Sequence, residues 1–197
     1  TTNPIVTPMC NAMFALKGRN SIIISPHPRA KKCSSHAVAL MSDELKKLGA
    51  PDDLIQVIEE PTMELSQQLM GAVDIIIATG GMGLVKAAYS SGKPAYGVGA
   101  GNVQVILDRE YDISQAAKDI IAGRIFDNGI ICSGEQSVIA PSEKYEEVVK
   151  EFVANGAFYV ENEEEVEALR TTLFPKGHMN GDLVGQSVQK IAETAGI

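Results

Sequence analysis

Cys132 is the residue of this sequence best suited to covalent chemistry. It lies in the segment FDNGIICSGEQS, in which Gly129 and Gly134 flank the thiol. Glycines allow close approach by a ligand and by neighbouring amides, and backbone donors favour the thiolate, a strong nucleophile. The alternative is a buried, inert cysteine, the usual state of a lone Cys in an apolar strand. Cys10 and Cys33 lie in helix-like stretches without neighbouring glycines, and they fit that alternative better.

A second pattern is a glycine-rich turn between an apolar run and a helix-like stretch. Its residues are Thr79, Gly80, Gly81, Met82 and Gly83. A strand, a glycine turn and a helix in this order let backbone N–H groups face a phosphate. The spacing matches neither G-x-G-x-x-G nor the Walker pattern. A simple tight turn, in which glycine supplies a positive φ, therefore stays open as the alternative.

A third pattern is a proline-stiffened, basic loop after a β-branched run. It comprises Ser25, Pro26, His27, Pro28, Arg29, Lys31 and Lys32. Open α/β sheets bind ligands at the carboxyl ends of their strands, so a contact with a ribose or a phosphate is reasonable here. The alternative is a helix-initiating loop whose basic side chains are only solvated.

Short apolar runs alternate with amphipathic stretches along the chain. The strands and helices that they predict would hold the three patterns in place. The strands are predicted at 20–25, 54–58, 74–78, 94–98, 103–107 and 137–140, and the helices at 30–48, 62–70, 84–90, 113–126 and 142–155. Thr62 and Asp112 stand where helix caps are expected. Such alternation predicts βαβ units and a mostly parallel α/β sheet. The acidic run 161–167 is typical of a solvated helix start.

Composition limits the class of protein. The chain has 197 residues and a formal net charge of −8, and 45% of its residues are hydrophobic. This predicts a globular protein that binds no nucleic acid, because phosphate neutralisation needs concentrated Lys and Arg. No apolar run approaches the roughly 18 residues of a membrane span, so no membrane association is expected.

The cysteines and the chain ends give further expectations. Three cysteines without C-x-x-C spacing predict neither a disulfide framework nor a metal site, and they favour a reducing, cytoplasmic setting. The chain opens TTNPIVTP, without an initiator Met or a signal-peptide pattern, and it ends at Gly196 and Ile197 without an evident closing helix. The sequence therefore suggests a piece of a longer polypeptide.

Together, four segments resemble one enzyme family. They are the opening TTNP, the loop SPHPRA, the turn ATGGMGLVKAAYSSGKPAYGVGAGN and the Cys132 segment, in collinear order from residue 1 to about residue 160. They are similar to the CoA-acylating branch of the aldehyde dehydrogenase superfamily. That branch includes acetaldehyde, propanal and succinate semialdehyde dehydrogenases and the aldehyde part of the bifunctional aldehyde–alcohol dehydrogenase.

The resemblance implies a reaction and a role for each matching residue. Cys132 would attack the aldehyde carbon, the resulting thiohemiacetal would pass a hydride to NAD or NADP, and coenzyme A would take the acyl group from the thioester. The developing oxyanion needs preorganised donors. The donors implied here are the side-chain amide of Asn3 and the backbone N–H of Cys132.

The resemblance also implies the fold and the cofactor contacts. A Rossmann-type parallel sheet with helices on both faces would form the nucleotide-binding domain, 1–128, and 129–197 would begin an α/β catalytic domain. The loop containing Ser25, Pro26, His27 and Arg29 would lie near the adenosine ribose, and the turn Thr79, Gly80 and Gly81 near the pyrophosphate. Arg29 or the neighbouring lysines could accept a 2′-phosphate. Coenzyme A would use much of the same cleft.

One missing side chain favours acylation over hydrolysis. Hydrolytic aldehyde dehydrogenases carry a Glu that activates water, whereas the matching stretch 96–102 has no carboxylate. The resemblance places Glu135 behind the nucleophile loop as a structural hydrogen-bonding group. Two alternatives remain: a hydrolytic dehydrogenase that gives a carboxylic acid, and an inactive nucleotide-binding fragment or assembly module.

The family resemblance also suggests partners and a location. The partners would be a small aldehyde and coenzyme A, with a homo-oligomer as the expected assembly. The setting would be the cytoplasm, including the lumen of a bacterial microcompartment or a fusion with an alcohol dehydrogenase.

Overall fold

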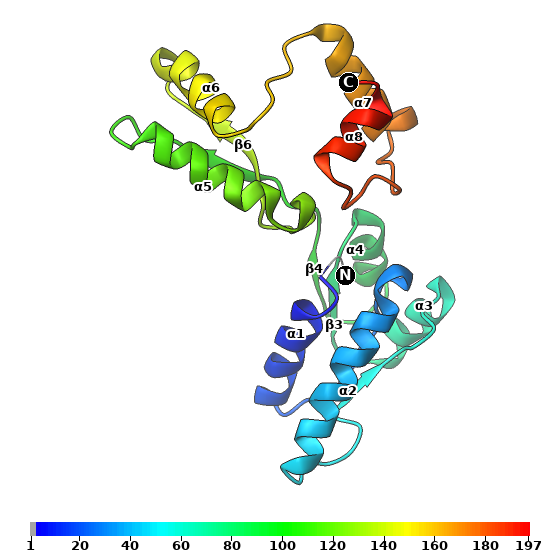
Figure 1. Cartoon of the computed structure of the whole chain (residues 1–197). Coiled ribbons are helices and arrows are strands. Elements are labelled where there is room, and N and C mark those ends of the chain that lie inside the picture. The colour runs from blue at the N-terminus through cyan, green and yellow to red at the C-terminus, as the bar shows by residue number, and fades with distance from the viewer. Residues whose placement is uncertain (1–2) are drawn as a thin grey trace. The chain divides into compact units, whose positions relative to one another are not determined.

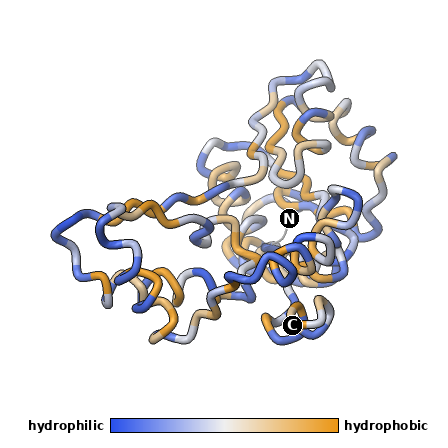
Figure 2. Tube along the Cα trace, turned by 90° about the horizontal axis from the view of Figure 1, so that it is seen from above, coloured by the Kyte–Doolittle hydropathy of each residue, from blue (hydrophilic) through white to orange (hydrophobic). Residues whose placement is uncertain are grey.

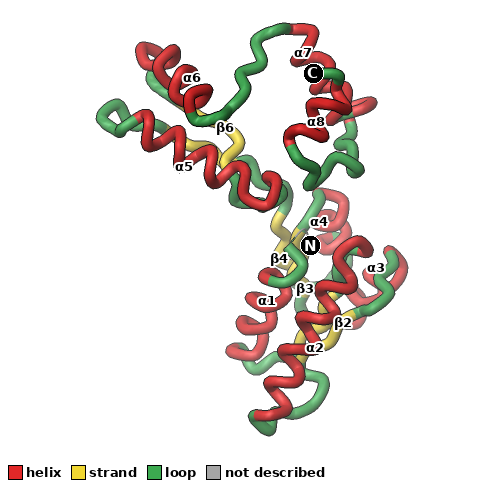
Figure 3. The backbone as a smooth tube through the Cα atoms, in the orientation of Figure 1, coloured by secondary structure: helices red, strands yellow, loops and turns green. Residues whose placement is uncertain are grey.

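The computed structural model describes residues 3–197 and divides into two compact units. The first unit is Thr1–Ala100 and the second is Gly101–Ile197. Figure 1 follows the chain through both, and Figure 3 separates their helices, strands and loops. The sequence predicted a nucleotide-binding domain at 1–128 and the start of a catalytic domain at 129–197. This division by function stays a prediction.

The first unit alternates helices with short strands. Its elements are α1 (Val6–Lys17), β1 (Ile22–Ile24), the 3-10 turn η1 (Pro28–Ala30), α2 (Lys31–Lys47), β2 (Ile55–Val57), α3 (Met63–Ala72), β3 (Ile76–Thr79), α4 (Met82–Tyr89) and β4 (Ala95–Val98). β1 pairs with β2 and β3 pairs with β4, both in parallel. A helix lies between the paired strands in sequence, as the βαβ pattern predicts.

The β1–β2 pair and the helices α1 and α2 share one core. Ala12, Ile24, Val38 and Ile55 are buried together there. Figure 1 shows α1 and α2 side by side. Complete burial of one such aliphatic side chain contributes about 1.5–3 kcal/mol, so these few residues anchor both strands to the helices.

The β3–β4 pair packs against α4. Ile76, Ala78 and Ala88 form its buried cluster. Alternate residues of the same strands point the other way, and Ile77 and Tyr96 are exposed. This alternation follows from the two-residue period of a strand.

The second unit has one parallel strand pair. Its elements are β5 (Val103–Ile106), α5 (Ile113–Ile125), the 3-10 turn η2 (Phe126–Gly129), β6 (Glu135–Ile139), η3 (Ser142–Lys144), α6 (Tyr145–Ala154), α7 (Glu163–Leu173), η4 (Pro175–Gly177) and α8 (Val188–Ala195). Its core joins α5, α6 and the loop after β5 through the buried residues Leu107, Ile113, Ala116, Ile120 and Val148. In Figure 2 the hydrophobic stretches of the trace alternate with hydrophilic ones along the chain.

The predicted α/β class with parallel strands is confirmed. The strands pair two by two among residues 3–197, in three parallel pairs. Thr62 caps α3 through the N–H of Leu65, at 3.1 Å, and Asp112 caps α5 through the N–H of Gln115, at 3.1 Å. None of the helices in the described part is long and apolar enough to cross a membrane.

The helix α8 corrects the expectation that the chain ends without a closing helix. Ser187 accepts a hydrogen bond from the N–H of Lys190 and begins the helix. Gly196 ends it with a left-handed φ of 76°. Ser at the start and Gly just past the end are the usual signals of a short helix.

Candidate active site

The loop after β1 leaves the sheet beside the loop after β2. The N–H of Ile58 donates to the carbonyl of Ile24 over 2.9 Å. The segments that follow β1 and β2 therefore leave the strand pair at the same, carboxyl edge. The hydroxyls of Ser25 and Ser66 lie 3.1 Å apart and connect the loop to α3. Pro26 is buried. The predicted ribose loop therefore starts from a fixed position at the carboxyl edge of the strands.

His27 begins a turn in this loop. Its Nδ1 accepts a hydrogen bond from the N–H of Arg29 over 3.1 Å, and Pro28 occupies the first position of the turn. The side chains of His27 and Arg29 are exposed. Because Nδ1 is used as a cap, Nε2 is the ring nitrogen that could contact a ligand.

The glycine turn after β3 has the positive φ that the tight-turn interpretation expected. Gly80 has a φ of +145°, and its N–H donates to the carbonyl of Val98 over 3.2 Å. Gly81 precedes α4, and no side chain caps the start of that helix. The positive φ expected of a tight turn is thus present at Gly80, and the phosphate contact stays a prediction. Gly81, the N-cap residue of α4, has no side chain that could accept from the first N–H groups of the helix.

Asn3 lies close to the first turn of α2. The hydroxyl of the buried Ser34 donates to the carbonyl of the adjacent Pro4 over 3.0 Å. Since α2 begins directly after the β1 loop, this bond places the Asn3 segment near the same edge of the β1–β2 pair. The side chain of Asn3 is half-buried.

Cys132 lies in the second unit, on the loop between η2 and β6. It is an exposed, free cysteine, which excludes the buried, inert alternative. Cys33 is also exposed, so the expectation of burial was wrong for it, although both Cys10 and Cys33 do lie in helices. Cys33 is in the first turn of α2, where side chains on the outer face meet solvent.

The nucleophile loop is bent by three consecutive residues with positive φ. They are Asp127 at 50°, Asn128 at 51° and Gly129 at 69°. Asn and Asp tolerate this region better than other side chains do, and Gly adopts it freely. The guanidinium of Arg124 lies close to the bend, with Nη1 3.5 Å from the carbonyl of Gly129.

A distant segment also supports this loop. The side-chain amide of Asn128 donates to the carbonyl of Gly185 over 3.0 Å, across 57 positions of sequence. A Cβ built on Gly185 would lie 3.3 Å from Cδ1 of Ile130. Sequence reasoning missed Asn128 and Gly185 as supports, because nothing local signals a contact over such a separation.

The segment that precedes β5 passes close to the backbone of Cys132. A Cβ on Gly101 would lie 3.1 Å from the carbonyl oxygen of Cys132. Gly101 lies in the stretch 96–102, which matches the position of the water-activating Glu of hydrolytic enzymes and contains no carboxylate.

Glu135 packs against α5, three residues after the thiol. Its carboxylate fills the space above Gly123, where a Cβ would come within 2.7 Å of Oε1 and closer still to Oε2. Oε2 is buried and has no hydrogen-bond partner among the described residues. The hydrogen-bonding role expected for this carboxylate is therefore not seen at Oε2.

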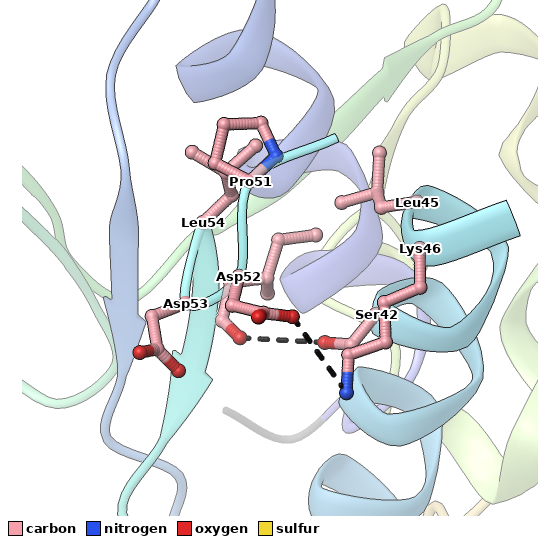
Figure 4. Close-up of a pocket in the computed structure, with 8 residues that line it drawn as sticks. Ser42, Leu45, Lys46, Pro51, Asp52, Asp53 and Leu54 are labelled. Carbon is pink, nitrogen blue, oxygen red and sulfur yellow. Dashed lines mark hydrogen bonds and ion pairs between the residues drawn. The ribbon is translucent and has the colours of Figure 1, made fainter. Parts of the chain in front are cut away.

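Two hollows lie in the first unit. Figure 4 shows one between the end of α2 and the start of β2, with the hydroxyl of Ser42 3.4 Å from the carbonyl of Ile55 and Lys46 Nζ 3.8 Å from Asp52. Its volume of about 10 Å³ suits little more than one water, and it lies at the amino end of β2, away from the ribose loop. A second, of about 440 Å³, follows α4 and is lined by Met82, Gly83, Val85, Lys86, Tyr89 and Ser90.

The perturbed acidic groups lie outside the predicted site. Hydrogen bonding by its own backbone, followed by the Arg109 guanidinium, lowers the pKa of Glu143. The Arg170 guanidinium likewise lowers the pKa of Glu167. These are exposed ion pairs on the surface of the second unit. Within residues 3–197, no group of three or more His, Cys, Asp or Glu side chains is placed to hold a metal ion.

The structure thus brings part of the predicted site together. The Asn3 segment and the loop from Ser25 to Arg29 lie near one edge of the β1–β2 pair. In the same unit, Thr79 to Gly81 lead from the end of β3 to the start of α4. Cys132 belongs to the second unit, so its partnership with Asn3 stays a prediction.

Comparison with known proteins decides the family. The model of the aldehyde dehydrogenase family matches residues 3–168. The chain belongs to the aldehyde dehydrogenase family. Within it, the chain is 63% identical over 196 residues to the succinate-semialdehyde dehydrogenase (acetylating) of Clostridium kluyveri, covering 100% of this chain and 43% of that relative.

Solved aldehyde dehydrogenases share the fold. An acetylating aldehyde dehydrogenase from Geobacillus thermoglucosidasius matches with a TM-score of 0.93 and 45% identity, over 100% of this chain and 44% of that one. The propionaldehyde dehydrogenase of Rhodopseudomonas palustris with bound propionyl-CoA matches with a TM-score of 0.91 and 36% identity, over 100% and 44%. The chain spans less than half the length of these relatives.

Proposed function

We propose that the protein carrying this chain is a CoA-acylating aldehyde dehydrogenase, which converts an aldehyde, coenzyme A and NAD(P)⁺ reversibly into acyl-CoA and NAD(P)H. The observation that carries the proposal is the surroundings of Cys132. Its thiol is exposed on a loop bent by Gly129, and the segment beside it at Gly101 has no carboxylate to activate water. The relatives reported above, named acetylating or solved with propionyl-CoA, support the same reaction.

The chain's own residues would perform the covalent steps. The Cys132 thiolate adds to the carbonyl carbon and forms a C–S bond, while the side-chain amide of Asn3 and the N–H of Cys132 donate to the resulting oxyanion. Bound NAD(P)⁺ supplies the hydride acceptor, which leaves a thioester on Cys132. The coenzyme A thiolate then adds to the thioester carbonyl, and the Cys132 thiolate leaves as acyl-CoA forms. Because the segment beside Cys132 at Gly101 has no carboxylate base, water competes poorly with this thiol.

The first unit would hold the dinucleotide. Ser25, Pro26, His27 and Arg29 would contact the adenosine ribose from the carboxyl edge of β1. Thr79, Gly80 and Gly81 would contact the pyrophosphate at the start of α4. The fit rests on two features of the structure: the exposed basic loop and the absence of a side-chain cap on α4. Uncapped N–H groups at a helix start are suited to phosphate oxygens.

The assembly and location are part of the proposal. We expect a cytoplasmic homo-oligomer, and a setting in a microcompartment or beside a fused alcohol dehydrogenase is compatible with the same chemistry. Apolar side chains of α1 support burial against another chain or another part of the protein, since Met13 and Phe14 are 56% and 69% exposed.

Trapping the acyl-enzyme tests the reaction on this chain's own nucleophile. The protein is incubated with propionyl-CoA or succinyl-CoA, quenched in acid, digested and analysed by mass spectrometry. The proposal predicts an acyl adduct on the Cys132 peptide and an equal amount of released coenzyme A. Cys33→Ser should keep the adduct, and Cys132→Ser should lose it. An adduct on Cys33, or none at all, contradicts the proposal.

A further inference from the structure

Cys132 lies in the second of two consecutive tight turns in the second unit. The N–H of Gly134 donates to the carbonyl of Ile131 over 3.2 Å and closes a four-residue turn in which Cys132 occupies a central position. The turn before it is closed by the N–H of Ile130, which donates to the carbonyl of Asp127 over 3.1 Å. Each of these hydrogen bonds holds one turn, and neither of them ties the first turn to the second.

The guanidinium of Arg124 contacts both turns. Its Nη1 donates to the carbonyl of Gly129, in the first turn, over 3.5 Å. A Cβ built on Gly129 would lie 3.2 Å from Cζ and from Nη2 of Arg124, and a Cβ on Gly134, in the second turn, would lie 3.5 Å from Nη1. Arg124 belongs to the last turn of α5. One helix thus presents a single planar group to a glycine on each side of the thiol.

Arg124 supports the loop without being part of the core. Its side chain is exposed, and the residues of α5 in the buried cluster of the second unit are Ile113, Ala116 and Ile120. The first turn is also held by the bond from the amide of Asn128 to the carbonyl of Gly185. Loss of the guanidinium should therefore leave the fold of the second unit intact and loosen the turn that carries the thiol.

We propose that Arg124 is a positioning residue, whose guanidinium holds the two turns together and fixes the Cys132 thiol and the Cys132 backbone N–H. The inference rests on the proposed function, in which this N–H donates to the oxyanion. A donor stabilises a developing charge well only when it is oriented in advance. Arg124 touches neither substrate nor cofactor in this role, and it acts only through the loop.

A cation beside a thiol has a second way to act, because its charge favours the thiolate. The two roles affect different reactions. A charge effect changes every reaction of the thiolate, including alkylation at a saturated carbon, which forms no oxyanion. A positioning effect changes acylation, in which the oxyanion needs its donor, and leaves alkylation as it was.

Two reactions of Cys132 in the full-length protein test the proposal. Acylation by propionyl-CoA or succinyl-CoA is quenched in acid at successive times and measured by mass spectrometry, and alkylation by iodoacetamide is followed in the same way across a range of pH. Arg124→Met should slow acylation by roughly tenfold, because a small misplacement of reacting groups is costly. The rate of alkylation and the midpoint of its pH profile should stay those of the wild type.

Matched variants separate the contact from a general change of charge. Arg109→Met removes another exposed guanidinium of the second unit, which bonds Glu143 instead of the nucleophile loop, and it should leave both reactions unchanged. Arg124→Lys should recover only part of the acylation rate, since an ammonium can donate to the Gly129 carbonyl but cannot span both glycines. Unfolding in urea should give the same midpoint for Arg124→Met and Arg109→Met.

The outcomes distinguish this inference from the proposed function. If wild-type Cys132 is alkylated but takes no acyl group from either thioester, the proposed function is contradicted and the inference with it. If the wild type is acylated and Arg124→Met reacts equally fast, only the role of Arg124 is contradicted. A shifted pH midpoint of alkylation would assign Arg124 a charge effect instead. A lower unfolding midpoint than that of Arg109→Met, or complete recovery in Arg124→Lys, would also contradict the bridging role.

Discussion

The hydroxyl of Ser34 donates a hydrogen bond to the carbonyl of Pro4 over 3.0 Å, and it joins the first turn of α2 to the start of the chain. Ser34 is completely buried, so its hydroxyl cannot form a hydrogen bond to water in place of the one to Pro4. The bond fixes the backbone next to Asn3, the predicted oxyanion donor. A buried hydroxyl thus connects the core of the first unit to a residue proposed for catalysis.

Removal of this hydroxyl should therefore affect both stability and activity. We expect Ser34→Ala to reduce the free energy of unfolding by about 1 kcal/mol, because one buried hydrogen bond is lost. It should also lower kcat more than it raises KM, since the Asn3 amide loses its fixed position. Urea unfolding and steady-state kinetics measure the two effects. Ser35→Ala, one residue later and half-buried, is the matched control, and an equal effect there would contradict the role of the Pro4 contact.

The Asn3 side chain itself should matter to the transition state. We expect Asn3→Ala to lower kcat by about 10²–10³-fold, as loss of one oxyanion donor does in other acyl-transfer enzymes. Cofactor binding should persist. Asn20→Ala is the control, because that amide bonds the nearby carbonyl of Gly18. A fall in cofactor affinity with kcat preserved would assign Asn3 to binding instead.

Cys132 and Cys33 are both exposed and free, yet only one should be essential. Cys132→Ala should reduce acyl-CoA formation to below a few per cent of wild type while the dinucleotide still binds, because no other group supplies the covalent step. Cys33→Ala should remain active. Initial rates and equilibrium titration of the cofactor provide the comparison. Residual turnover of the Cys132 variant above a few per cent would rule out its role as nucleophile.

Gly123 should behave differently from an ordinary helix glycine. Replacing a helical Gly with Ala stabilises a helix by up to about 1 kcal/mol. At Gly71 of α3 nothing lies within 4 Å of a new Cβ, so Gly71→Ala should show that gain. At Gly123 the new Cβ would lie within 2.7 Å of Oε1 of Glu135, so Gly123→Ala must displace the carboxylate and should show no gain.

A double-mutant cycle isolates the Glu135 contact. In a Glu135→Ala background, Gly123→Ala should recover the stabilisation, which gives a coupling energy of about 1 kcal/mol, whereas Gly71→Ala should be unaffected. Unfolding in urea measures all four combinations. Additive effects at Gly123 and Glu135 would show that the carboxylate does not occupy the space above α5.

Local signals in the sequence were sufficient for most elements. β-branched runs marked the strands, and Thr62 and Asp112 marked the starts of α3 and α5 because a side-chain oxygen must accept from an early N–H. For α1 the stretch around Cys10 was predicted to be helix-like, but no bounds were predicted, since the helix begins without a side-chain cap. For α8 the signals were present at Ser187 and Gly196 but were not used.

The contacts that build the candidate site were less accessible to sequence reasoning. Ser34 and Pro4 are separated by 30 positions, and Asn128 and Gly185 by 57. Such pairs result from packing and topology, which local patterns do not encode. By contrast, residue type alone singled out Cys132 between two glycines and the glycine turn at Gly80 as candidates, and the structure shows an exposed cysteine and a positive φ at these positions.

The requirement for coenzyme A is the most direct test of the central claim. The absorbance of reduced nicotinamide is followed in the full-length protein with propanal or succinate semialdehyde, with NAD and with NADP, each in the presence and absence of coenzyme A. We expect sustained reduction only when coenzyme A is present, and none in Cys132→Ala. Sustained reduction that ignores coenzyme A would contradict the account, because water would then be the acceptor of the acyl group.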